Sequence, residues 1–231
     1  MCEVVILIVM PDLTQTEFGA LLQVIHPEKQ NRINKFRFYR DAQNGLLGDV
    51  LARLEICRVT GLSNEELIFS TYEYGKPFLT NNPDIHHNIS HSGHYVACAV
   101  AYAPVGIDIE TIKNVDLKIA ERFFAADETS YISNGPQAER FFEIWTKKES
   151  RIKMEGKGLS KPLESFSVLD SADAGNIAYR EVFRSDEAIC HVCLCGGENP
   201  SVRVIDTQEL LRQSKLLVAG NNNTSLSGGC L

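Results

Sequence analysis

The pattern of apolar and polar positions in the first half predicts alternating strands and helices. Residues 4–10 form a run of seven apolar side chains rich in β-branched residues, which is typical of a buried strand. A Thr14-x-x-Glu17 capping box then introduces an amphipathic helix. Apolar positions between residues 46 and 56 recur at the spacing of a helix that buries a wide face. Residues 95–101 are again apolar, as in a buried strand.

The second half combines helices and strands in the same way. From residue 107 onward the sequence alternates strictly, with isoleucines on one face of a strand and Asp108 and Glu110 on the other. Further helical patterns cover about 116–124, 126–133, 138–156 and 207–218, and strand patterns cover 166–170, 177–183, 188–195 and 202–206. These patterns predict an α+β protein.

The chain divides near its middle, at Ala103-Pro104. We expect an N-terminal half over residues 1–104 and a C-terminal half over residues 105–220. The polar segment over residues 221–231 is expected to be a disordered tail.

Composition narrows the class of protein. The chain has 231 residues, of which 44% are hydrophobic and 23% charged, values typical of a folded soluble protein. A net charge of −7 argues against nucleic acid as a partner. No apolar run approaches the roughly 20 residues that span a bilayer, so no membrane role is expected. Seven scattered cysteines favour reduced thiols and a cytoplasmic protein.

Three carboxylates are the strongest candidates for chemistry. Asp108 and Glu110 point the same way from a strand with apolar neighbours, and Glu149 lies on the predicted long helix. Carboxylate oxygens are the ligands that Mg²⁺ prefers, completed by water and substrate phosphates. The alternative is that all three are solvated surface acids.

Several basic residues could bind phosphate. Lys153 lies four residues after Glu149, on the same helical face, where it either neutralises phosphate charge or forms an exposed ion pair. A Walker-type phosphate loop is absent from the sequence. Lys29, Arg32, Lys76 and His91 could contact a phosphate or be solvated surface groups.

Two other motifs receive simpler interpretations. In Ser90-His91-Ser92, neighbouring side chains of an extended chain point to opposite faces, which argues against a serine nucleophile. Cys190, Cys193 and Cys195 could bind a soft metal, but their apolar, strand-like surroundings favour packed thiols.

Taken together, the sequence blocks resemble one family. The matching stretches, in order, are HPEKQNRINKFRFYRDA, LLGDVL, FSTYEYGKPFL, NISHSGHYVACAVA, VGIDIE, RFFAADE and IWTKKESRIKMEGKGLS, over roughly residues 25–170. They resemble the 4′-phosphopantetheinyl transferases of the larger, surfactin-synthetase-activating type. The resemblance implies a pseudo-dimer of two similar α+β halves with the active site in the cleft between them, and a monomeric protein because one chain contains both halves.

The resemblance also implies a reaction. The phosphopantetheine arm of coenzyme A would pass to a serine of an apo peptidyl or acyl carrier domain, as in nonribosomal peptide and antibiotic biosynthesis, releasing adenosine 3′,5′-bisphosphate. The family's Mg²⁺ ligands fall on Asp108, Glu110 and Glu149, the trio reached above from strand and helix geometry. Glu149 is the family's usual candidate for the general base, with a metal-bound water as the alternative, and Lys153 matches its catalytic pyrophosphate-contacting lysine.

The family's coenzyme A contacts fall on a further set of residues. They are Lys29, Lys76, Ser90 and His91, with Arg32 where relatives often have lysine. The sequence departs from the family at Gln43-Asn44-Gly45, where relatives commonly have a basic residue and a side chain that touches the nucleotide.

Alternative functions remain open at this point. One is a non-catalytic module that binds coenzyme A or carrier proteins, and another is a Mg²⁺-dependent hydrolase that releases phosphopantetheine to water. A patch that could receive an acidic carrier helix consists of Lys113, Lys118, Arg122, Phe123 and Phe124, although the two phenylalanines could simply belong to the core.

Overall fold

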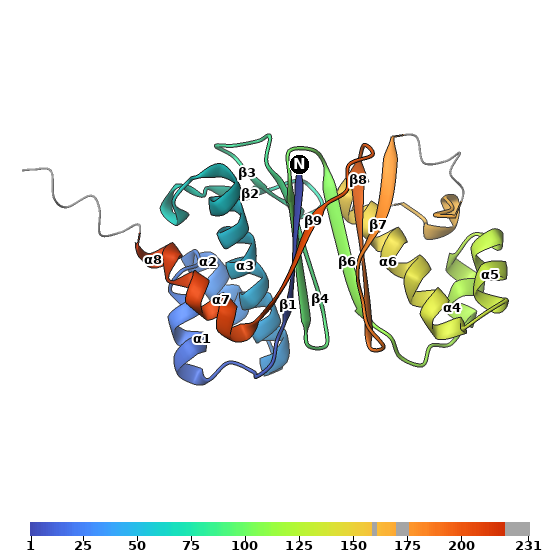
Figure 1. Ribbon diagram of the computed structural model, residues 1–231, viewed down its shortest axis with the longest axis horizontal. Helices are drawn as coiled ribbons and strands as arrows, with labels where there is room; N and C mark the ends of the chain where they lie inside the picture. Colours follow the sequence, from blue (N-terminus) through green and yellow to red (C-terminus); the bar gives the residue numbers. More distant parts are fainter. Residues whose placement is uncertain (159–160, 170–175, 220–231) are drawn as a thin grey trace, which may run out of the picture.

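The computed structural model describes residues 1–158, 161–169 and 176–219, and it is an α+β fold, as predicted (Figure 1). The strands are β1 (Cys2–Ile8), β2 (Phe69–Thr71), β3 (Pro77–Leu79), β4 (His86–Ser92), β5 (Tyr95–Ala101), β6 (Val105–Thr111), β7 (Ile177–Arg184), β8 (Ala188–Cys195) and β9 (Ser201–Asp206). The helices are α1 (Gln15–Leu22), α2 (Pro27–Ile33), α3 (Tyr39–Thr60), α4 (Lys118–Phe123), α5 (Ala126–Ser133), α6 (Gln137–Glu155), α7 (Thr207–Ser214) and α8 (Leu216–Ala219), with short 3₁₀ turns η1 (Asn64–Glu66) and η3 (Leu163–Ser165). No helix in the described ranges is long and apolar enough to cross a membrane.

The first half is built on a four-stranded sheet. Its strand order is β4-β5-β1-β9, with β1 antiparallel to β5 and parallel to β9. Helix α3 covers its outer face, where Leu47 and Leu51 pack against Val5 and Val96 in one apolar cluster. The apolar runs at 4–10 and 95–101 are therefore central strands, because both of their faces are covered.

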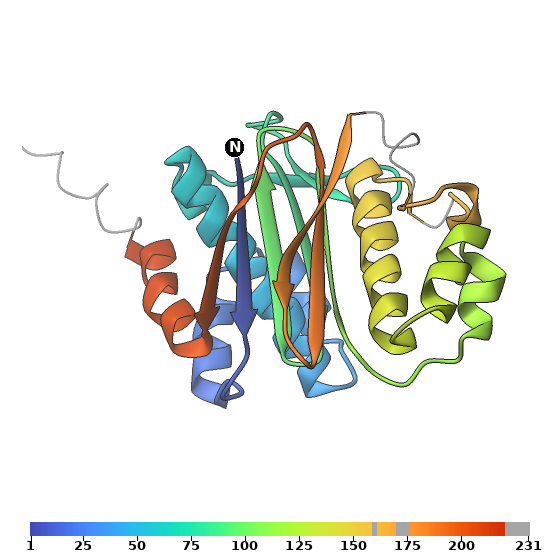
Figure 2. The same ribbon diagram turned by 45° about the vertical axis from the view of Figure 1, so that its right-hand side comes forward.

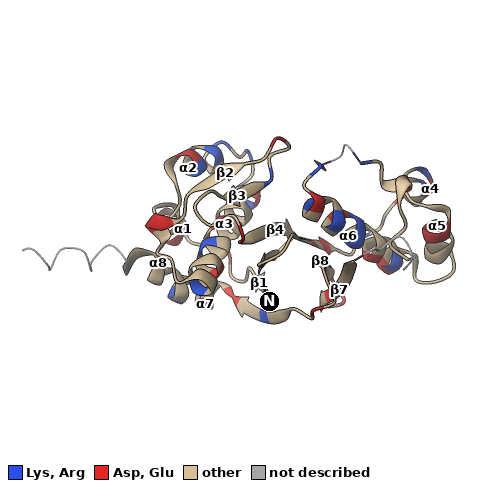
Figure 3. Cartoon of the chain, turned by 90° about the horizontal axis from the view of Figure 1, so that it is seen from above, with Lys and Arg blue, Asp and Glu red and all other residues tan. Residues whose placement is uncertain are grey.

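The second half is built on a three-stranded sheet of order β6-β8-β7, covered by α6 with α4 and α5 beyond it (Figure 2). Seen from above, the two sheets face each other and the helices lie outside (Figure 3). Ile107 and Ile109 of β6 join Val4 and Ile6 of β1 in the apolar cluster between the sheets. The predicted alternation in β6 is correct, since its isoleucines face this core and leave Asp108 on the opposite side.

The end of the chain crosses back to the first half. Strand β9 pairs with β1 over Glu3–Ser201 to Ile8–Asp206, and α7 packs on the same sheet through Leu210. The segment after residue 200, which we expect in the C-terminal half, thus adds a strand and a helix to the sheet of the first half. The physical reason is that β1 is apolar on both faces and gains a second hydrogen-bonded neighbour from this segment.

Two short segments were given specific expectations, a strand from residue 166 and a tail from residue 221. Residues 166–169 do not form the predicted strand, because Phe166 and Val168 pack into the helical layer beside α6 and the Phe166 carbonyl accepts a hydrogen bond from Lys148. The predicted tail over 221–231 lies outside the described residues.

Candidate active site

Helix α6 lies directly on β6, and a glycine makes this approach possible. A Cβ at Gly106 would sit 2.0 Å from the Ser150 carbonyl oxygen and 2.3 Å from the Met154 nitrogen. Any larger side chain there would push the helix off the strand. The contact brings one face of α6, with Glu149 and Lys153, over Asp108.

A pocket of about 320 Å³ opens between the two halves. Its wall is formed by Ile89, Ser90, His91, Asp108, Glu110, Trp145, Glu149 and Lys153. A neighbouring pocket of about 290 Å³ shares Glu149 and Lys153 and extends to Tyr74 and Lys76. The structure thus gathers six of the predicted site residues around one cavity.

Asp108 is the most constrained of the three carboxylates. Its Oδ1 accepts hydrogen bonds from Lys153 Nζ at 2.6 Å and from Ser90 Oγ at 2.8 Å. Lys153 Nζ also donates to Ser90 Oγ at 2.9 Å. The second carboxylate oxygen, Oδ2, is buried without a hydrogen-bond partner, which is costly unless another group is bound there.

The carboxylates repel one another in a partly dehydrated site. Burial raises the pKa of Asp108, against the opposing effect of the Lys153 ammonium. Burial likewise raises the pKa of Glu110 and of Glu149, and the nearby charge of Asp108 adds to both shifts. Three carboxylates face one lysine, so the pocket favours an additional cation.

The residues fit a hard divalent cation chemically. They offer carboxylate oxygens, and the partnerless Asp108 Oδ2 is the kind of atom that a cation would satisfy. Within the described ranges, no three His, Cys, Asp or Glu side chains are already close enough to hold a metal ion. The Lys153 ammonium instead lies against Asp108 Oδ1.

Comparison with known proteins identifies the architecture. The N-terminal family model of 4′-phosphopantetheinyl transferases matches residues 12–103, and the 4′-phosphopantetheinyl transferase superfamily model matches residues 104–208. The chain belongs to the 4′-phosphopantetheinyl transferase family. The chain is 47% identical to 4′-phosphopantetheinyl transferase Sfp of Bacillus subtilis over 213 residues, covering 86% of this chain and 95% of that protein. The chain is also 35% identical to 4′-phosphopantetheinyl transferase gsp of Aneurinibacillus migulanus over 225 residues, covering 91% and 94% of the two chains.

The predicted coenzyme A contacts of this transferase lie at different places. Ser90 and His91 line the pocket, whereas Lys29 and Arg32 lie outside its wall on α2. Lys29 Nζ is 3.5 Å from Asp49 Oδ1, and Arg32 is exposed. Burial, followed by the Lys153 charge, lowers the pKa of His91, which favours the neutral imidazole.

Lys76 has a structural contact that the sequence did not predict. Its Nζ donates hydrogen bonds to the carbonyl oxygens of Val105 at 3.1 Å and Met154 at 2.9 Å. These oxygens belong to the start of β6 and the last turn of α6. Burial lowers the pKa of Lys76 to about 8. Lys76 therefore connects the first half to both elements that carry the carboxylates.

Gln43 and Asn44, where the sequence departs from the family pattern, both make structural contacts. Gln43 is buried, where its Oε1 accepts a hydrogen bond from the Leu13 nitrogen and its Nε2 donates to Asp12. Asn44 is also buried and donates to the Gly93 carbonyl. Both side chains hold neighbouring loops together.

The cysteines of β8 and the phenylalanines of the predicted carrier patch differ in how deeply they are buried. Cys190 and Cys193 are buried free thiols with raised pKa values caused by burial, in agreement with packed thiols, whereas Cys195 is exposed. Of the two phenylalanines in the predicted carrier patch, Phe124 belongs to the core, and Phe123 remains 39% exposed.

Two functional candidates were missed in the sequence. Trp145 lines the pocket, where its ring stacks on Phe141 with centroids 5.8 Å apart. Ser92 donates a hydrogen bond from Oγ to Glu110 Oε2 at 2.7 Å. The sequence contains a signal for Ser92, since the polar residues at every second position of β4 share one face of the strand.

Proposed function

We propose that this chain is an active, Mg²⁺-dependent transferase that moves the 4′-phosphopantetheine arm of coenzyme A to a serine of an apo peptidyl or acyl carrier domain. Adenosine 3′,5′-bisphosphate is the leaving product. The observation that carries this proposal is the meeting of Asp108, Glu110, Glu149 and Lys153 in one pocket between the halves of a chain of this family.

Asp108, Glu110 and Glu149 are the residues that would hold the metal ion. Their oxygens suit Mg²⁺, and burial, followed for Glu149 by the charge of Asp108, raises the pKa of these carboxyls in the absence of a metal ion. Bound there, Mg²⁺ would neutralise charge on the pyrophosphate of coenzyme A as the phosphodiester forms.

Lys153 supplies the second positive charge. Its ammonium lies at the pocket wall within reach of both Asp108 and Ser90. In the reaction, the serine oxygen of the carrier forms a bond to the phosphorus that bears pantetheine, and the bond from that phosphorus to the bridging oxygen breaks. Lys153 is placed to stabilise the charge that develops on the departing phosphate oxygens.

Glu149 is the proposed acceptor of the serine proton. It lies in the pocket wall with Asp108 and Lys153, and a water held at the metal site is the alternative acceptor, because a carboxylate that binds a metal ion is a weaker base. The proton lost by the serine thus moves to a group that lies beside the reacting phosphate. For the nucleotide end of coenzyme A, the proposed basic and polar contacts are Lys76 in the adjoining pocket, His91 in the carboxylate pocket, and Lys29 and Arg32 on α2, outside both pocket walls.

The carrier domain would dock beside the cleft. Lys113, Lys118 and Arg122 are exposed cations, and the Arg122 guanidinium lies over the exposed Phe123 ring, 5.1 Å from its centroid. This combination suits an acidic helix that presents its serine at the helix start. We expect the enzyme to act as a monomer, since one chain contains both halves. We also expect it to be cytoplasmic.

Intact-mass spectrometry of an apo peptidyl carrier domain tests the proposal. The carrier is incubated with this protein, coenzyme A and Mg²⁺, with a chelator in the control. A metal-dependent gain of one phosphopantetheine mass is the expected result. Failure to modify several different carriers, with coenzyme A still bound, would support the non-catalytic binding module. Loss of phosphopantetheine to water without a carrier would support the hydrolase.

A further inference from the structure

Strand β4 contacts β6 through side chains rather than through a backbone ladder. β6 pairs with β8 along one edge, and the other edge presents backbone N–H groups that need acceptors. These acceptors are three side chains at alternate positions of β4, which we name the β4 side-chain ladder: Asn88, Ser90 and Ser92. The Ile107 nitrogen donates to Asn88 Oδ1 at 2.9 Å, the Ile109 nitrogen to Ser90 Oγ at 3.3 Å, and the Thr111 nitrogen to Ser92 Oγ at 3.1 Å.

The two serines of the ladder use their hydroxyl protons in the same way. A hydroxyl has one proton to donate and two lone pairs to accept with. Ser90 Oγ accepts from the residue after Asp108 and donates to Asp108 Oδ1 at 2.8 Å. Ser92 Oγ accepts from the residue after Glu110 and donates to Glu110 Oε2 at 2.7 Å. Each serine therefore links a β6 amide to the carboxylate one position earlier.

This arrangement orients the carboxylates. A hydrogen bond to one oxygen restricts rotation of the carboxylate and leaves the other oxygen for a different partner. In Asp108, Oδ1 takes the bonds from Ser90 and Lys153, and Oδ2 is the buried atom without a partner. The Glu110 carboxylate is held by Ser92 through Oε2.

We propose that Ser92 is a positioning residue that sets the orientation of Glu110 for a divalent cation, with Ser90 doing the same for Asp108. The inference rests on the proposed metal site. Among the described residues, the pocket wall includes Ser90 and Glu110 but not Ser92, so Ser92 acts through Glu110 rather than on the substrate. Ser90 thereby gains a role besides the coenzyme A contact that the family resemblance implies.

Mn²⁺ binding to Ser92→Ala tests the inference. Free Mn²⁺ is measured by electron paramagnetic resonance while the ion is titrated onto the protein, alone and again with coenzyme A. We expect the dissociation constant for Mn²⁺ to rise about 10- to 100-fold, as when an outer hydrogen bond to a metal ligand is removed. At a saturating concentration of metal ion, the KM for coenzyme A should change by less than about threefold, because Ser92 orients a metal ligand only.

Three further variants separate positioning from stability. Ser201→Ala removes an exposed hydroxyl at the start of β9 and should bind Mn²⁺ like the wild type. Ser92→Cys keeps the side-chain size but has a much weaker donor, so it should also weaken Mn²⁺ binding, and it serves if Ser92→Ala fails to fold. Ser92→Thr retains the hydroxyl and should restore Mn²⁺ affinity.

Three outcomes would overturn the inference or its basis. If Ser92→Ala and Ser92→Cys lower only the melting temperature and bind Mn²⁺ normally, Ser92 merely joins the two halves. If Ser92→Ala weakens Mn²⁺ binding equally in a Glu110→Gln background, it does not act through Glu110. If the wild type itself binds no Mn²⁺, the proposed metal site fails. This outcome differs from the other two because it is seen in the wild type, without any variant.

Discussion

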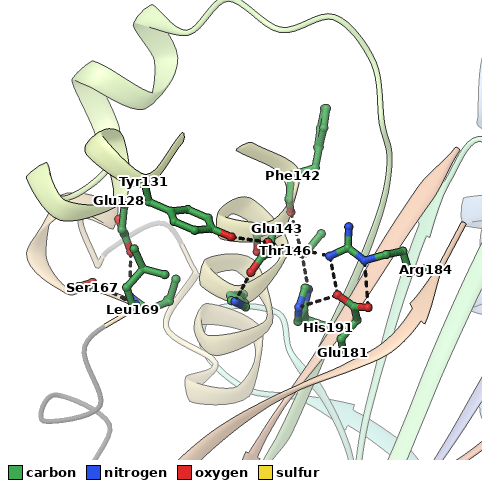
Figure 4. A network of polar contacts seen from close by, with 12 residues as sticks. Glu128, Tyr131, Phe142, Glu143, Thr146, Ser167, Leu169, Glu181, Arg184 and His191 are labelled. Atoms are coloured by element: carbon green, nitrogen blue, oxygen red, sulfur yellow. Dashed lines mark hydrogen bonds and ion pairs between the residues drawn. The ribbon is translucent and has the colours of Figure 1, made fainter. Parts of the chain in front are cut away.

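Acid should destabilise this protein through a histidine that folds in its neutral form. His191 of β8 is 2% exposed, and its Nδ1 lies 2.8 Å from Thr146 Oγ1 on α6 (Figure 4). Burial, followed by the charges of Lys147 and Arg184, lowers its pKa to about 3. The nearest carboxylate, Glu181, has its Oε2 3.8 Å from Nε2. The neutral ring joins α6, which carries Glu149 and Lys153, to the second sheet.

The size of the effect follows from the two pKa values. Unfolded histidine binds a proton below about pH 6.5, whereas folded His191 does not until about pH 3. The unfolded state therefore gains protons that the folded state lacks, and stability falls as the pH drops below 6.5. Between pH 7.5 and pH 5 the loss from His191 is about 2 kcal/mol. Buried His87, with its pKa lowered to about 4, adds a similar loss in the wild type.

Urea unfolding at pH 7.5 and pH 5.0 measures this loss, with the fluorescence of Trp145, the single tryptophan, as the probe. The variant His191→Gln is neutral at both values, so its free energy of unfolding should fall by about 2 kcal/mol less than that of the wild type. His26→Gln, at the exposed start of α2, is the control and should fall like the wild type. Equal losses in His191→Gln and the wild type would refute the reasoning.

Three further predictions concern the site. Asp108→Ala and Glu149→Ala should each lower kcat for carrier modification at least about 100-fold with an unchanged far-UV circular dichroism spectrum, and near-wild-type activity in either would refute the metal assignment. Lys29→Ala and His91→Ala should raise the KM for coenzyme A about tenfold but leave that for dephospho-coenzyme A nearly unchanged, if these groups hold the ribose phosphate; equal effects on both substrates would contradict that role. Gly106→Ala should lower the free energy of unfolding in urea by about 1–3 kcal/mol, because its Cβ would collide with the α6 backbone, and an unchanged value would show that α6 can shift freely.

Local periodicity was sufficient to predict part of the site. The alternation in β6 correctly separated the isoleucines in the core from Asp108 on the opposite side. The spacing of four between Glu149 and Lys153 correctly placed both on one face of a helix, and both line the same pocket. Such features depend only on the backbone geometry of single elements, which the sequence determines directly.

Features that depend on contacts between distant segments were not accessible in this way. The pairing of β9 with β1 joins residues almost 200 positions apart, and no local pattern specifies which strand edge β9 meets. The hydrogen bonds of Lys76 to Val105 and Met154 likewise depend on how the halves are packed. The resemblance relates Gln43-Asn44-Gly45 to a basic residue and a nucleotide-contacting side chain of relatives, whereas the buried Gln43 amide accepts a hydrogen bond from the Leu13 backbone nitrogen.

The junction between the halves and the candidate site consist partly of the same atoms. Ser90 accepts a backbone N–H of β6, which joins the sheets, and donates to Asp108, which orients a carboxylate. Lys153 completes the arrangement by bonding to both. Because these bonds share atoms, a substitution at Ser90 should reduce stability and metal affinity together, whereas one at Ser92 leaves the Asp108 pair intact. Under the proposed function, the buried Asp108 Oδ2, which has no hydrogen-bond partner, is an atom whose burial costs stability and whose partner would be the cation.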